Sequence, residues 1–324
     1  MTKRYPCPVL CLGVIPQDVV MQLASSGYRV MSEDHFSTIG EPALTEVRGI
    51  LRQGNAVVRT QLFERLPELE VIASVGVGYD AANVATALRH GVLVSNTPGV
   101  LDAEVADFAV AVLLAAIRQI PRADAYVRTR EWLNGPFHNT ATLRGRTVGL
   151  VGIGRIGEQV AKRISAFDVE VVYHSRSPRC DLPWRHFPSL SSMAGHVDTM
   201  IVIVPGSPAT ERLITAEILH RLGPSGILVN LSRGSVVDEA ALLQALDSGA
   251  LLAAALDVFE NEPAINEAFL AFQNVVLTPH TASGSAHTRK AMWQLACDNL
   301  TGWLENRTLL TPVPEVLGLL KSMN

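Results

Sequence analysis

The chain has 324 residues and a formal net charge of −4. At roughly 150 residues per domain, this length predicts about two domains, each able to bury a core without disulfides or bound metal. The small net charge gives no electrostatic reason to expect a nucleic acid or an anionic membrane as a partner. The composition also excludes a collagen, a coiled coil and a disordered chain.

The cysteines and the apolar segments indicate in which cellular compartment the protein resides. Cys7, Cys11, Cys180 and Cys297 form no CxxC pair and no zinc-binding pattern with histidine, so we expect free thiols and no metal site. Prolines interrupt the apolar start of the chain and no cleavage site follows it, which argues against a signal peptide. The longest apolar run, 109–117, is far too short to span a membrane. We therefore predict a cytoplasmic protein.

Short apolar runs alternate with helical patterns along most of the chain. Runs rich in Val and Ile that are apolar at consecutive positions are typical of strands buried on both faces of a parallel sheet. The alternation predicts an α/β fold. The expected strands are Val9–Val14, Ala56–Val58, Val71–Val75, Thr147–Val151, Val169–Tyr173, Met200–Val204, Gly226–Asn230, Leu252–Leu256 and Val275–Leu277.

Two helices are predicted next to functional motifs. Asp102 can cap the first, whose apolar residues recur at helical spacing. These residues are Val105, Phe108, Ala109, Val112, Leu113 and Ala116. The second helix is expected from Arg155 to Phe167, with Ile156, Val160, Ile164 and Phe167 on one apolar stripe.

A glycine motif, G-x-G-x-x-G, lies between the expected strand at 147–151 and the second helix. Gly152 permits the tight turn, Gly154 lets a pyrophosphate approach the backbone, and Gly157 lets helix and strand pack closely. Arg155 and Ile156 fall at the helix N-terminus, whose free N–H groups favour an anion. The motif predicts a dinucleotide site. Another G-x-G, at Gly76 and Gly78, has Ala81 in place of the third glycine, and we interpret that loop as a substrate-side element.

The residues after the expected strand Val169–Tyr173 help to decide between NADH and NADPH as the cofactor. An NAD site usually has an acid there for the ribose hydroxyls, but no acid occurs between Glu170 and Asp181. Ser175, Arg176 and Ser177 are the kind of side chains that a 2′-phosphate needs. The alternative is that Arg176 is a solvated loop charge. We favour NADPH as the cofactor, with NADH less favoured.

Three polar residues follow expected strands at the carboxyl edge of the second sheet. They are Arg233, Glu262 and His280. Ligands of doubly wound sheets bind at this edge. An imidazole can donate a proton to a developing alkoxide, a carboxylate can stabilise the imidazolium, and a guanidinium can hold a substrate carboxylate. Each residue alone also has an ordinary structural interpretation, as an ion pair, a loop acid or a cap.

Five segments resemble the D-2-hydroxyacid dehydrogenase family, and in particular its glyoxylate/hydroxypyruvate reductases, including the hydroxyphenylpyruvate reductase type. The first two segments are Ser74-Val-Gly-Val-Gly-Tyr-Asp80 and Asn96-Thr-Pro-Gly-Val-Leu101 with Val105-Ala-Asp107. The other three are Asn230-Leu-Ser-Arg-Gly-Ser-Val-Val-Asp-Glu239, Leu256-Asp-Val-Phe-Glu-Asn-Glu-Pro263 and Leu277-Thr-Pro-His-Thr-Ala-Ser283. They occur in the order of the family, and the resemblance covers the chain from about residue 50 to 315.

The resemblance implies two Rossmann-like, doubly wound parallel-sheet domains. A discontinuous substrate-binding domain would comprise 1–98 and 284–324, and a dinucleotide-binding domain with a dimerisation helix would comprise 99–283. The resemblance also implies a homodimer acting on a small 2-oxoacid or D-2-hydroxyacid, with the helix from Asp102 and the segment to about Arg144 as its dimerisation region. Arg233, Glu262 and His280 match the family's catalytic residues.

Further roles are implied position by position. Val75 and Gly76 match the loop whose amides hold the substrate carboxylate. Pro205, Leu231 and Asp257 match positions that line the nicotinamide. Trp132 resembles a tryptophan that in some relatives reaches the partner's active site, although it would serve equally by packing in a dimer interface.

The sequence departs from the family at a few positions. Asp102 stands where many members have Thr, which puts its contact with the cofactor in doubt. Ala255 replaces a common Gly, and Ser175 replaces the acid of NAD-dependent members. Arg59, outside the motifs, is either a cleft charge or a surface residue.

The resemblance leaves two other functions to weigh. A nucleotide-sensing transcriptional corepressor shares this fold, but the complete set of Arg233, Glu262 and His280 favours an enzyme. Formate dehydrogenases resemble this chain with Gln at the position of Glu262, so the carboxylate argues against that activity.

Overall fold

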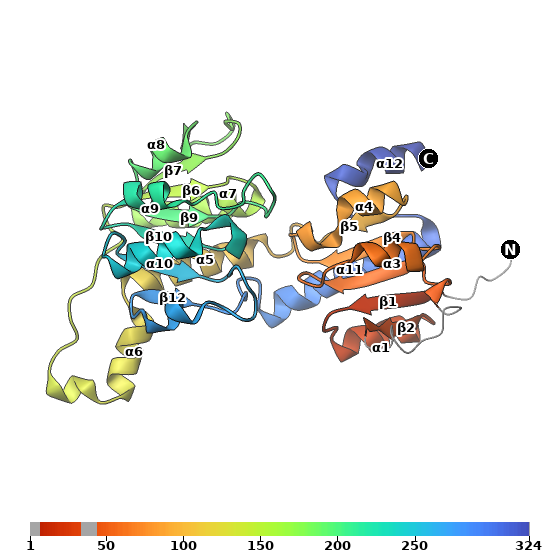
Figure 1. Cartoon of the computed structure of the whole chain (residues 1–324), viewed down its shortest axis with the longest axis horizontal. Helices are drawn as coiled ribbons and strands as arrows, with labels where there is room; N and C mark the ends of the chain where they lie inside the picture. The colour runs from red at the N-terminus through yellow and green to blue at the C-terminus, as the bar shows by residue number, and fades with distance from the viewer. Residues whose placement is uncertain (1–6, 34–43, 324) are drawn as a thin grey trace. The chain divides into compact units, whose positions relative to one another are not determined.

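The computed structural model describes residues 7–33 and 44–323, and the chain divides into two compact units (Figure 1). Unit 1 extends to Leu101 and resumes at Ser285, whereas unit 2 is the continuous segment Asp102–Gly284. The prediction placed these divisions at 98/99 and 283/284. The resumption at Ser285 brings a long helix near the C-terminus into the same unit as the N-terminal sheet.

Unit 1 is built on a parallel sheet of five described strands in the order β2-β1-β3-β4-β5. The strands are β1 (Pro8–Leu12), β2 (Arg29–Ser32), β3 (Gly49–Gln53), β4 (Val71–Val75) and β5 (Leu93–Ser95). The described helices are α1 (Gln17–Ser25), α3 (Thr60–Arg65), η2 (Asp80–Ala82), α4 (Val84–Arg89), α11 (Ala286–Asn306), η7 (Pro314–Val316) and α12 (Leu317–Met323). A Cβ on Gly49 would lie 2.6 Å from Leu300 Cδ1, so α11 packs tightly against β3.

Unit 2 is built on a parallel sheet of seven strands in the order β12-β11-β10-β9-β6-β7-β8. The strands are β6 (Thr147–Val151), β7 (Glu170–His174), β8 (Arg185–Phe187), β9 (Thr199–Val202), β10 (Ile227–Asn230), β11 (Ala253–Leu256) and β12 (Val275–Leu277). One core cluster joins the sheet to α5 (Asp102–Ile117) and α7 (Arg155–Ile164), and the other joins it to α8 (Leu190–Ala194), α9 (Ala216–Leu222) and α10 (Glu239–Asp247). The remaining elements are α6 (Ile120–Arg128), η3 (Glu131–Asn134), η4 (Ser165–Phe167), η5 (Gly234–Val236) and η6 (Glu267–Ala271).

These two parallel sheets confirm the predicted fold class. The order of strands in unit 2 reverses direction next to β6, where the chain crosses from β7 and β8 to β9. In doubly wound sheets the ligand crevice lies beyond the carboxyl ends of the strands at such a switch point. The glycine motif follows β6 at this position.

Several predicted elements were wrong in detail. Ala56–Val58 is a loop between β3 and α3, not a strand, and Val57 is 59% exposed. The strand is Gly49–Gln53 instead, and the pattern hid it because it ends in polar residues, of which Arg52 is fully buried. The first strand stops at Leu12, since Val14 is exposed, and Phe167 lies beyond the end of α7 on the surface.

The strands β2, β5 and β8 were not predicted at all. They have three or four residues each and lie at sheet edges. Strands this short do not give the long apolar run by which a central strand is recognised, even where every residue is buried, as in β5.

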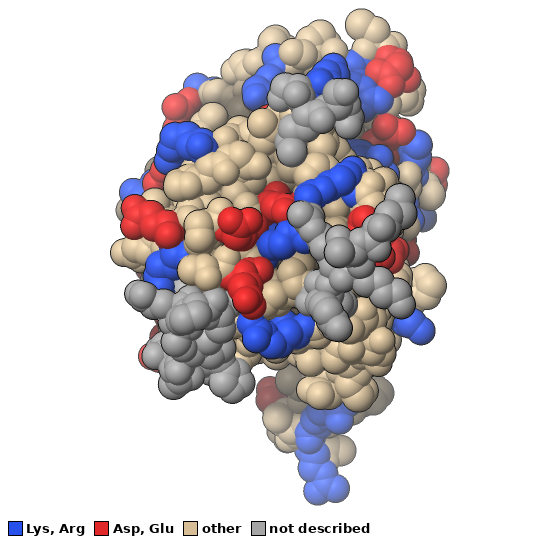
Figure 2. Space-filling model, turned by 90° about the vertical axis from the view of Figure 1, so that its right-hand side faces the viewer, with Lys and Arg blue, Asp and Glu red and all other residues tan. Residues whose placement is uncertain are grey.

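The surface charge, the length of the helices and the arrangement of possible metal ligands concern the predicted binding partners. On the face in Figure 2, the described basic and acidic side chains are interspersed. No helix among the described residues is long and apolar enough to cross a membrane. No group of three or more His, Cys, Asp or Glu in residues 7–33 and 44–323 is arranged to hold a metal ion.

Candidate active site

The glycine motif forms a tight turn between β6 and α7. Gly152 has φ +100°, and a Cβ there would lie 2.2 Å from the carbonyl oxygen of Ile203. A Cβ on Gly157 would lie 2.5 Å from the carbonyl oxygen of Gly152, so helix and turn are in backbone contact. A Cβ on Gly154 would meet nothing within 4 Å. The open face at Gly154 therefore fits the approach of a cofactor pyrophosphate.

Arg155 joins this turn to the start of α5. Its Nε donates to Asp102 Oδ2 over 2.8 Å. The second oxygen, Asp102 Oδ1, is buried with no hydrogen-bond partner in the described part of the chain. Asp102 thus contacts the dinucleotide loop through Arg155, and the neighbouring Ile156 packs partly against the core.

The loop after β7 presents the residues predicted to hold a 2′-phosphate. Arg176 is exposed, and no described residue pairs with its guanidinium. The Ser175 hydroxyl donates to the carbonyl of Ser177 over 2.7 Å, so it must rotate to donate to a phosphate. The hydroxyl of Ser177 makes no hydrogen bond with the described residues.

Arg179 secures this loop, and the sequence analysis missed it. Its Nε donates to Asp181 over 2.9 Å, and its Nη2 lies 3.4 Å from Glu158 on α7. This guanidinium lowers the pKa of Asp181 to about 2, chiefly through the hydrogen bond. The backbone N–H of Arg179 also donates to the Tyr173 hydroxyl over 2.8 Å. The loop is therefore closed on β7 and tied to the helix that follows the glycine turn.

Glu262 and His280 meet at the carboxyl edge of the sheet. They follow the neighbouring strands β11 and β12. His280 Nδ1 lies 2.7 Å from Glu262 Oε2, and Glu262 Oε1 accepts the N–H of Phe259 over 3.1 Å. Because a carboxylate only accepts, Nδ1 carries the proton and Nε2 is left for other chemistry.

The pKa of Glu262 reflects these neighbours. Burial raises it, but the hydrogen bond and charge of His280, the Phe259 N–H and the charge of Arg233 outweigh burial, so the pKa lies below the ordinary value. Glu262 is thus a carboxylate throughout the neutral range. The charge of Arg233 thus acts on the same carboxylate that His280 contacts.

Asp257 holds the backbone that carries His280. Its carboxylate accepts the Thr278 hydroxyl over 2.7 Å and the N–H groups of Thr281 and Ala282 over 2.8 and 2.9 Å. His280 has φ +50°, a conformation that costs energy for a residue other than glycine. The predicted role of Asp257, lining the nicotinamide, missed this scaffolding because those donors lie 21 to 25 residues away.

Arg233 follows β10 and passes close to the segment after β9. A Cβ on Gly206 would lie 2.7 Å from Arg233 Cγ, so glycine makes room for the arginine stem. Buried Asn230 donates to the Arg233 carbonyl over 3.1 Å. Pro205, which precedes Gly206, is exposed, and Leu231 is half-buried against the core.

The substrate-side loop of unit 1 follows β4. The N–H of Gly76 donates to Thr97 Oγ1 over 2.8 Å, so this amide is already used. Asn96 Nδ2 donates to the carbonyl of Val77 over 2.8 Å. The N–H groups of Val77 and Gly78 have no acceptor among the described residues. Of the predicted pair Val75 and Gly76, the Gly76 amide is therefore occupied, whereas the amides of Val77 and Gly78 are available to an anion.

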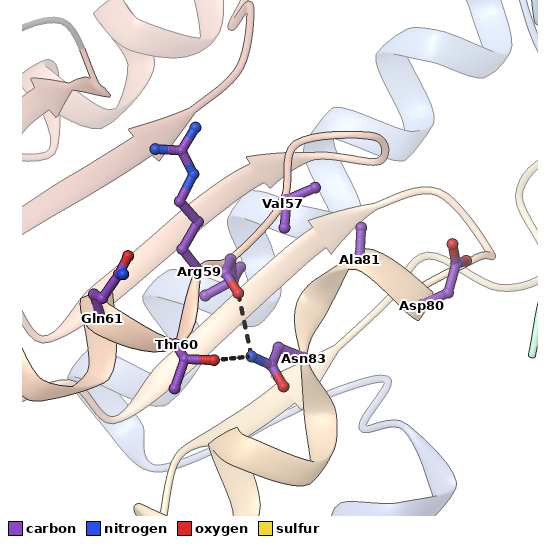
Figure 3. A pocket seen from close by; sticks show the side chains of 8 residues that line it. Val57, Arg59, Thr60, Gln61, Asp80, Ala81 and Asn83 are labelled. Atoms are coloured by element: carbon purple, nitrogen blue, oxygen red, sulfur yellow. Dashed lines mark hydrogen bonds between the residues drawn. The ribbon is translucent and has the colours of Figure 1, made fainter. Parts of the chain in front are cut away.

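Arg59 lies at a shallow hollow of unit 1 (Figure 3). The hollow is lined by Val57, Val58, Arg59, Thr60, Gln61, Asp80, Ala81 and Asn83. The Arg59 guanidinium points away from Asp80 in this view, and the side chain is exposed. Arg59 is a surface residue of unit 1.

Trp132 belongs to a segment that leaves the layers of unit 2. Neither α6 nor η3 has a buried residue, and Figure 1 shows both extending from the body of the unit. Large apolar side chains are exposed there, namely Ile120 (52%), Val127 (54%), Trp132 (65%) and Leu133 (82%). In contrast, α5 buries its apolar stripe in the core of unit 2.

Comparison with known proteins agrees with this geometry. Residues 110–282 match the family model described as D-isomer specific 2-hydroxyacid dehydrogenase, NAD binding domain. Glyoxylate/hydroxypyruvate reductase A of Arabidopsis thaliana is 38% identical over 88% of this chain and 91% of its own length. Hydroxyphenylpyruvate reductase of Plectranthus scutellarioides is 40% identical over 82% and 85%.

A solved structure is similar over nearly the whole chain. It is the NADPH-dependent glyoxylate/hydroxypyruvate reductase of Sinorhizobium meliloti in complex with NADP and malonate, with a TM-score of 0.92 and 43% identity, covering 96% of this chain and 98% of that one. Fold and site define a nicotinamide-dependent oxidoreductase. The chain belongs to the D-isomer specific 2-hydroxyacid dehydrogenase family, as its motifs predicted.

Proposed function

We propose that this chain is an NADPH-preferring 2-oxoacid reductase that acts on glyoxylate and hydroxypyruvate, with oxidation of D-2-hydroxyacids as the reverse reaction. The observation that carries the proposal is the 2.7 Å pair between His280 and Glu262 at the sheet edge that follows the dinucleotide turn. The names of the relatives from Arabidopsis thaliana and Sinorhizobium meliloti support the choice of substrates.

His280 is the proposed general acid. A bound nicotinamide supplies the hydride, and the carbonyl oxygen then needs a proton. Nδ1 is engaged with Glu262, so Nε2 delivers this proton, and the carboxylate stabilises the imidazolium before transfer. In the oxidation direction Nε2 accepts the proton back.

The guanidinium of Arg233 is the proposed partner of the substrate carboxylate in unit 2, where it also polarises the neighbouring carbonyl. In unit 1, Val77 and Gly78 join Val75 as proposed anion donors, in place of Gly76, whose N–H is bonded to Thr97. Asn96 and Thr97 hold that loop in shape.

The proposed preference for NADPH is assigned to the loop after β7. Arg176 offers an unpaired guanidinium to a 2′-phosphate, and Ser177 offers a hydroxyl. No carboxylate from residue 171 to 180 would repel the phosphate. Pro205, Leu231 and Asp257 remain the proposed lining of the nicotinamide half.

We also propose a homodimer, with α6 and η3 as its contact surface. The support is the exposed apolar set at Ile120, Val127, Trp132 and Leu133, which a second copy would cover. Light scattering at micromolar concentration checks this assignment. A particle of about 35 kDa, the mass of one chain (34.9 kDa), would contradict it.

The cytoplasm is the proposed location. All four cysteines are free, and burial raises the pKa of Cys11 and Cys297 to about 12, which makes both thiols unreactive. Free thiols are typical of a reducing compartment.

A kinetic panel tests the function. Oxidation of NADPH and NADH is followed at 340 nm with glyoxylate, hydroxypyruvate, pyruvate and hydroxyphenylpyruvate. We expect turnover of glyoxylate and hydroxypyruvate, with kcat/KM for NADPH exceeding that for NADH. Absence of turnover with every 2-oxoacid would reject the reductase assignment.

A further inference from the structure

The loop that carries Glu262 is in contact with a second segment, from Arg233 to Glu239. A Cβ on Gly234 would lie 1.8 Å from the carbonyl carbon of Phe259 and 2.2 Å from the nitrogen of Glu260. Only glycine fits against that peptide. The turn next to Arg233 is thus pressed against the backbone that leads to Glu262.

Glu239 makes a second contact with the same peptide. It is the first residue of α10, is 8% exposed, and accepts the N–H of Glu260 over 2.7 Å. Burial raises its pKa, the Glu260 N–H lowers it and the Glu260 charge raises it, so the net shift is upward. A buried carboxyl group is costly unless a hydrogen bond offsets the loss of water.

Capping of α10 does not explain why the carboxyl group of Glu239 is buried. Asp238 already caps the helix, because its side chain accepts the N–H of Ala241 over 3.0 Å. Glu239 is directed instead to the loop after β11. An ion pair on this loop, between Arg212 and Glu260, is 3.6 Å long and largely exposed, so it fixes the backbone only weakly.

These contacts connect Glu239 to His280 through hydrogen bonds that are joined by the backbone of Phe259 and Glu260. Glu239 holds the N–H of Glu260, the adjacent Phe259 N–H holds one oxygen of Glu262, and the other oxygen of Glu262 holds His280. We propose that Glu239 is a positioning residue, which fixes the peptide between Phe259 and Glu260 so that Glu262 is aimed at His280. The inference rests on the proposed role of that pair as the source of the proton.

Three substitutions at position 239 separate positioning from simple packing. Glu239→Met removes the acceptor, whereas Glu239→Gln keeps an oxygen that can accept the Glu260 N–H. Glu239→Asp keeps an acid at the helix start but shortens its reach, and it serves if the methionine variant does not fold. The readout is the titration midpoint of the His280 imidazole, followed by NMR, together with the alkaline limb of kcat/KM for glyoxylate reduction.

We expect Glu239→Met to lower both the titration midpoint of His280 and the alkaline limb of kcat/KM by about 0.5–1 pH unit. This is part of the roughly 1–3 units by which a close opposite charge shifts a pKa. Glu239→Asp should produce a smaller shift in the same direction, and Glu239→Gln should restore the wild-type value. Glu239→Met in a Glu262→Gln background should add no further shift, because both act through one contact.

Two outcomes would overturn the proposal. One is a lower melting temperature in Glu239→Met or Glu239→Asp with an unchanged imidazole midpoint, which means packing alone. The other is a further shift in the double variant, which means an independent path. Because NMR reports the pair without turnover, failure of the enzyme to reduce any 2-oxoacid is a separate result that bears only on the proposed function.

Discussion

The loop that carries His280 and the loop that carries Arg176 both follow strands of the same sheet, but they are held differently. The first is secured by Asp257, which lies in the neighbouring segment after β11, is 1% exposed and accepts three donors from the His280 loop. The second is secured by Arg179, whose ion pairs with Asp181 and Glu158 lie at the surface. The charged group that holds the first loop is buried, whereas the charged groups that hold the second lie at the surface.

The difference has an energetic consequence. A buried hydrogen bond to a charged group contributes about 1.5–3 kcal/mol, whereas an exposed ion pair contributes roughly 0–1 kcal/mol. Proton transfer needs atoms held within hydrogen-bond distance, but a phosphate contact at the surface tolerates adjustment. Substitutions should therefore cost most at the interior-held end and least at the adenosine end.

The largest effect is expected at His280. His280→Ala removes the proton donor, so kcat for glyoxylate reduction should fall by about 10²–10⁴-fold. NADPH binding, measured by fluorescence titration, should be nearly unchanged because the dinucleotide turn is separate in sequence. A variant that keeps more than a tenth of wild-type kcat would remove His280 from the chemistry.

Arg233→Ala should cost about 10²-fold in kcat/KM, because the guanidinium is assigned both to binding and to polarising the carbonyl. We expect KM to rise and kcat to fall together. Arg59→Ala is the matched control, since it removes an exposed arginine of unit 1 and should leave both constants near wild type. Equal losses in the two variants would mean that general electrostatic attraction, and not a specific contact, is responsible.

The contrast between buried and exposed residues also explains which strands were predicted correctly from the sequence. Thr147–Val151 and Val71–Val75 were predicted to the residue because the interior strands of a parallel sheet are continuous apolar runs. In unit 1 the pattern failed at Gly49–Gln53, where a buried arginine interrupts it. Arg52 satisfies its charge with Ser74 and with backbone carbonyls, which no local pattern can reveal.

The candidate site divides in a similar way. The glycine motif and the residues Arg233, Glu262 and His280 were found because they are local motifs or strand ends. The supporting contacts were missed, namely Asp257 to the His280 loop, Glu239 to Glu260, and Thr97 to Gly76. Each pairs residues more than twenty positions apart, so only the folded structure places them together.

The pH dependence of the reaction tests the contact between Glu262 and His280. The pKa of Glu262 lies below its ordinary value, so in the neutral range the group is charged and stabilises the imidazolium of His280. Glu262→Gln removes that charge, and the imidazolium then loses its proton at lower pH. Since reduction needs the protonated form, the alkaline limb of kcat/KM should move down by about 1–3 units. An unchanged profile would contradict the pairing.

The smallest effect is expected at the adenosine end. A charge-assisted hydrogen bond of Arg176 to a 2′-phosphate is stronger than an exposed pair of two mobile side chains and contributes about 1.5–3 kcal/mol, or roughly ten- to a hundredfold in preference. We therefore expect kcat/KM for NADPH to exceed that for NADH by about tenfold or more. Equal use of the two cofactors by the wild-type enzyme would contradict the assignment.

A double substitution decides whether that preference resides in the side chains of the loop or in its shape. Ser175→Asp with Arg176→Ala replaces attraction of the 2′-phosphate by repulsion, so the ratio of kcat/KM values for NADPH and NADH should fall to one or below. Arg179→Met is the control, because its guanidinium is paired with Asp181 and Glu158 and holds the loop without facing a phosphate. It should weaken both cofactors alike, by less than about fivefold, as expected for exposed ion pairs. A selective loss of NADPH in the Arg179 variant would instead make Arg179 the phosphate ligand and Arg176 the solvated charge.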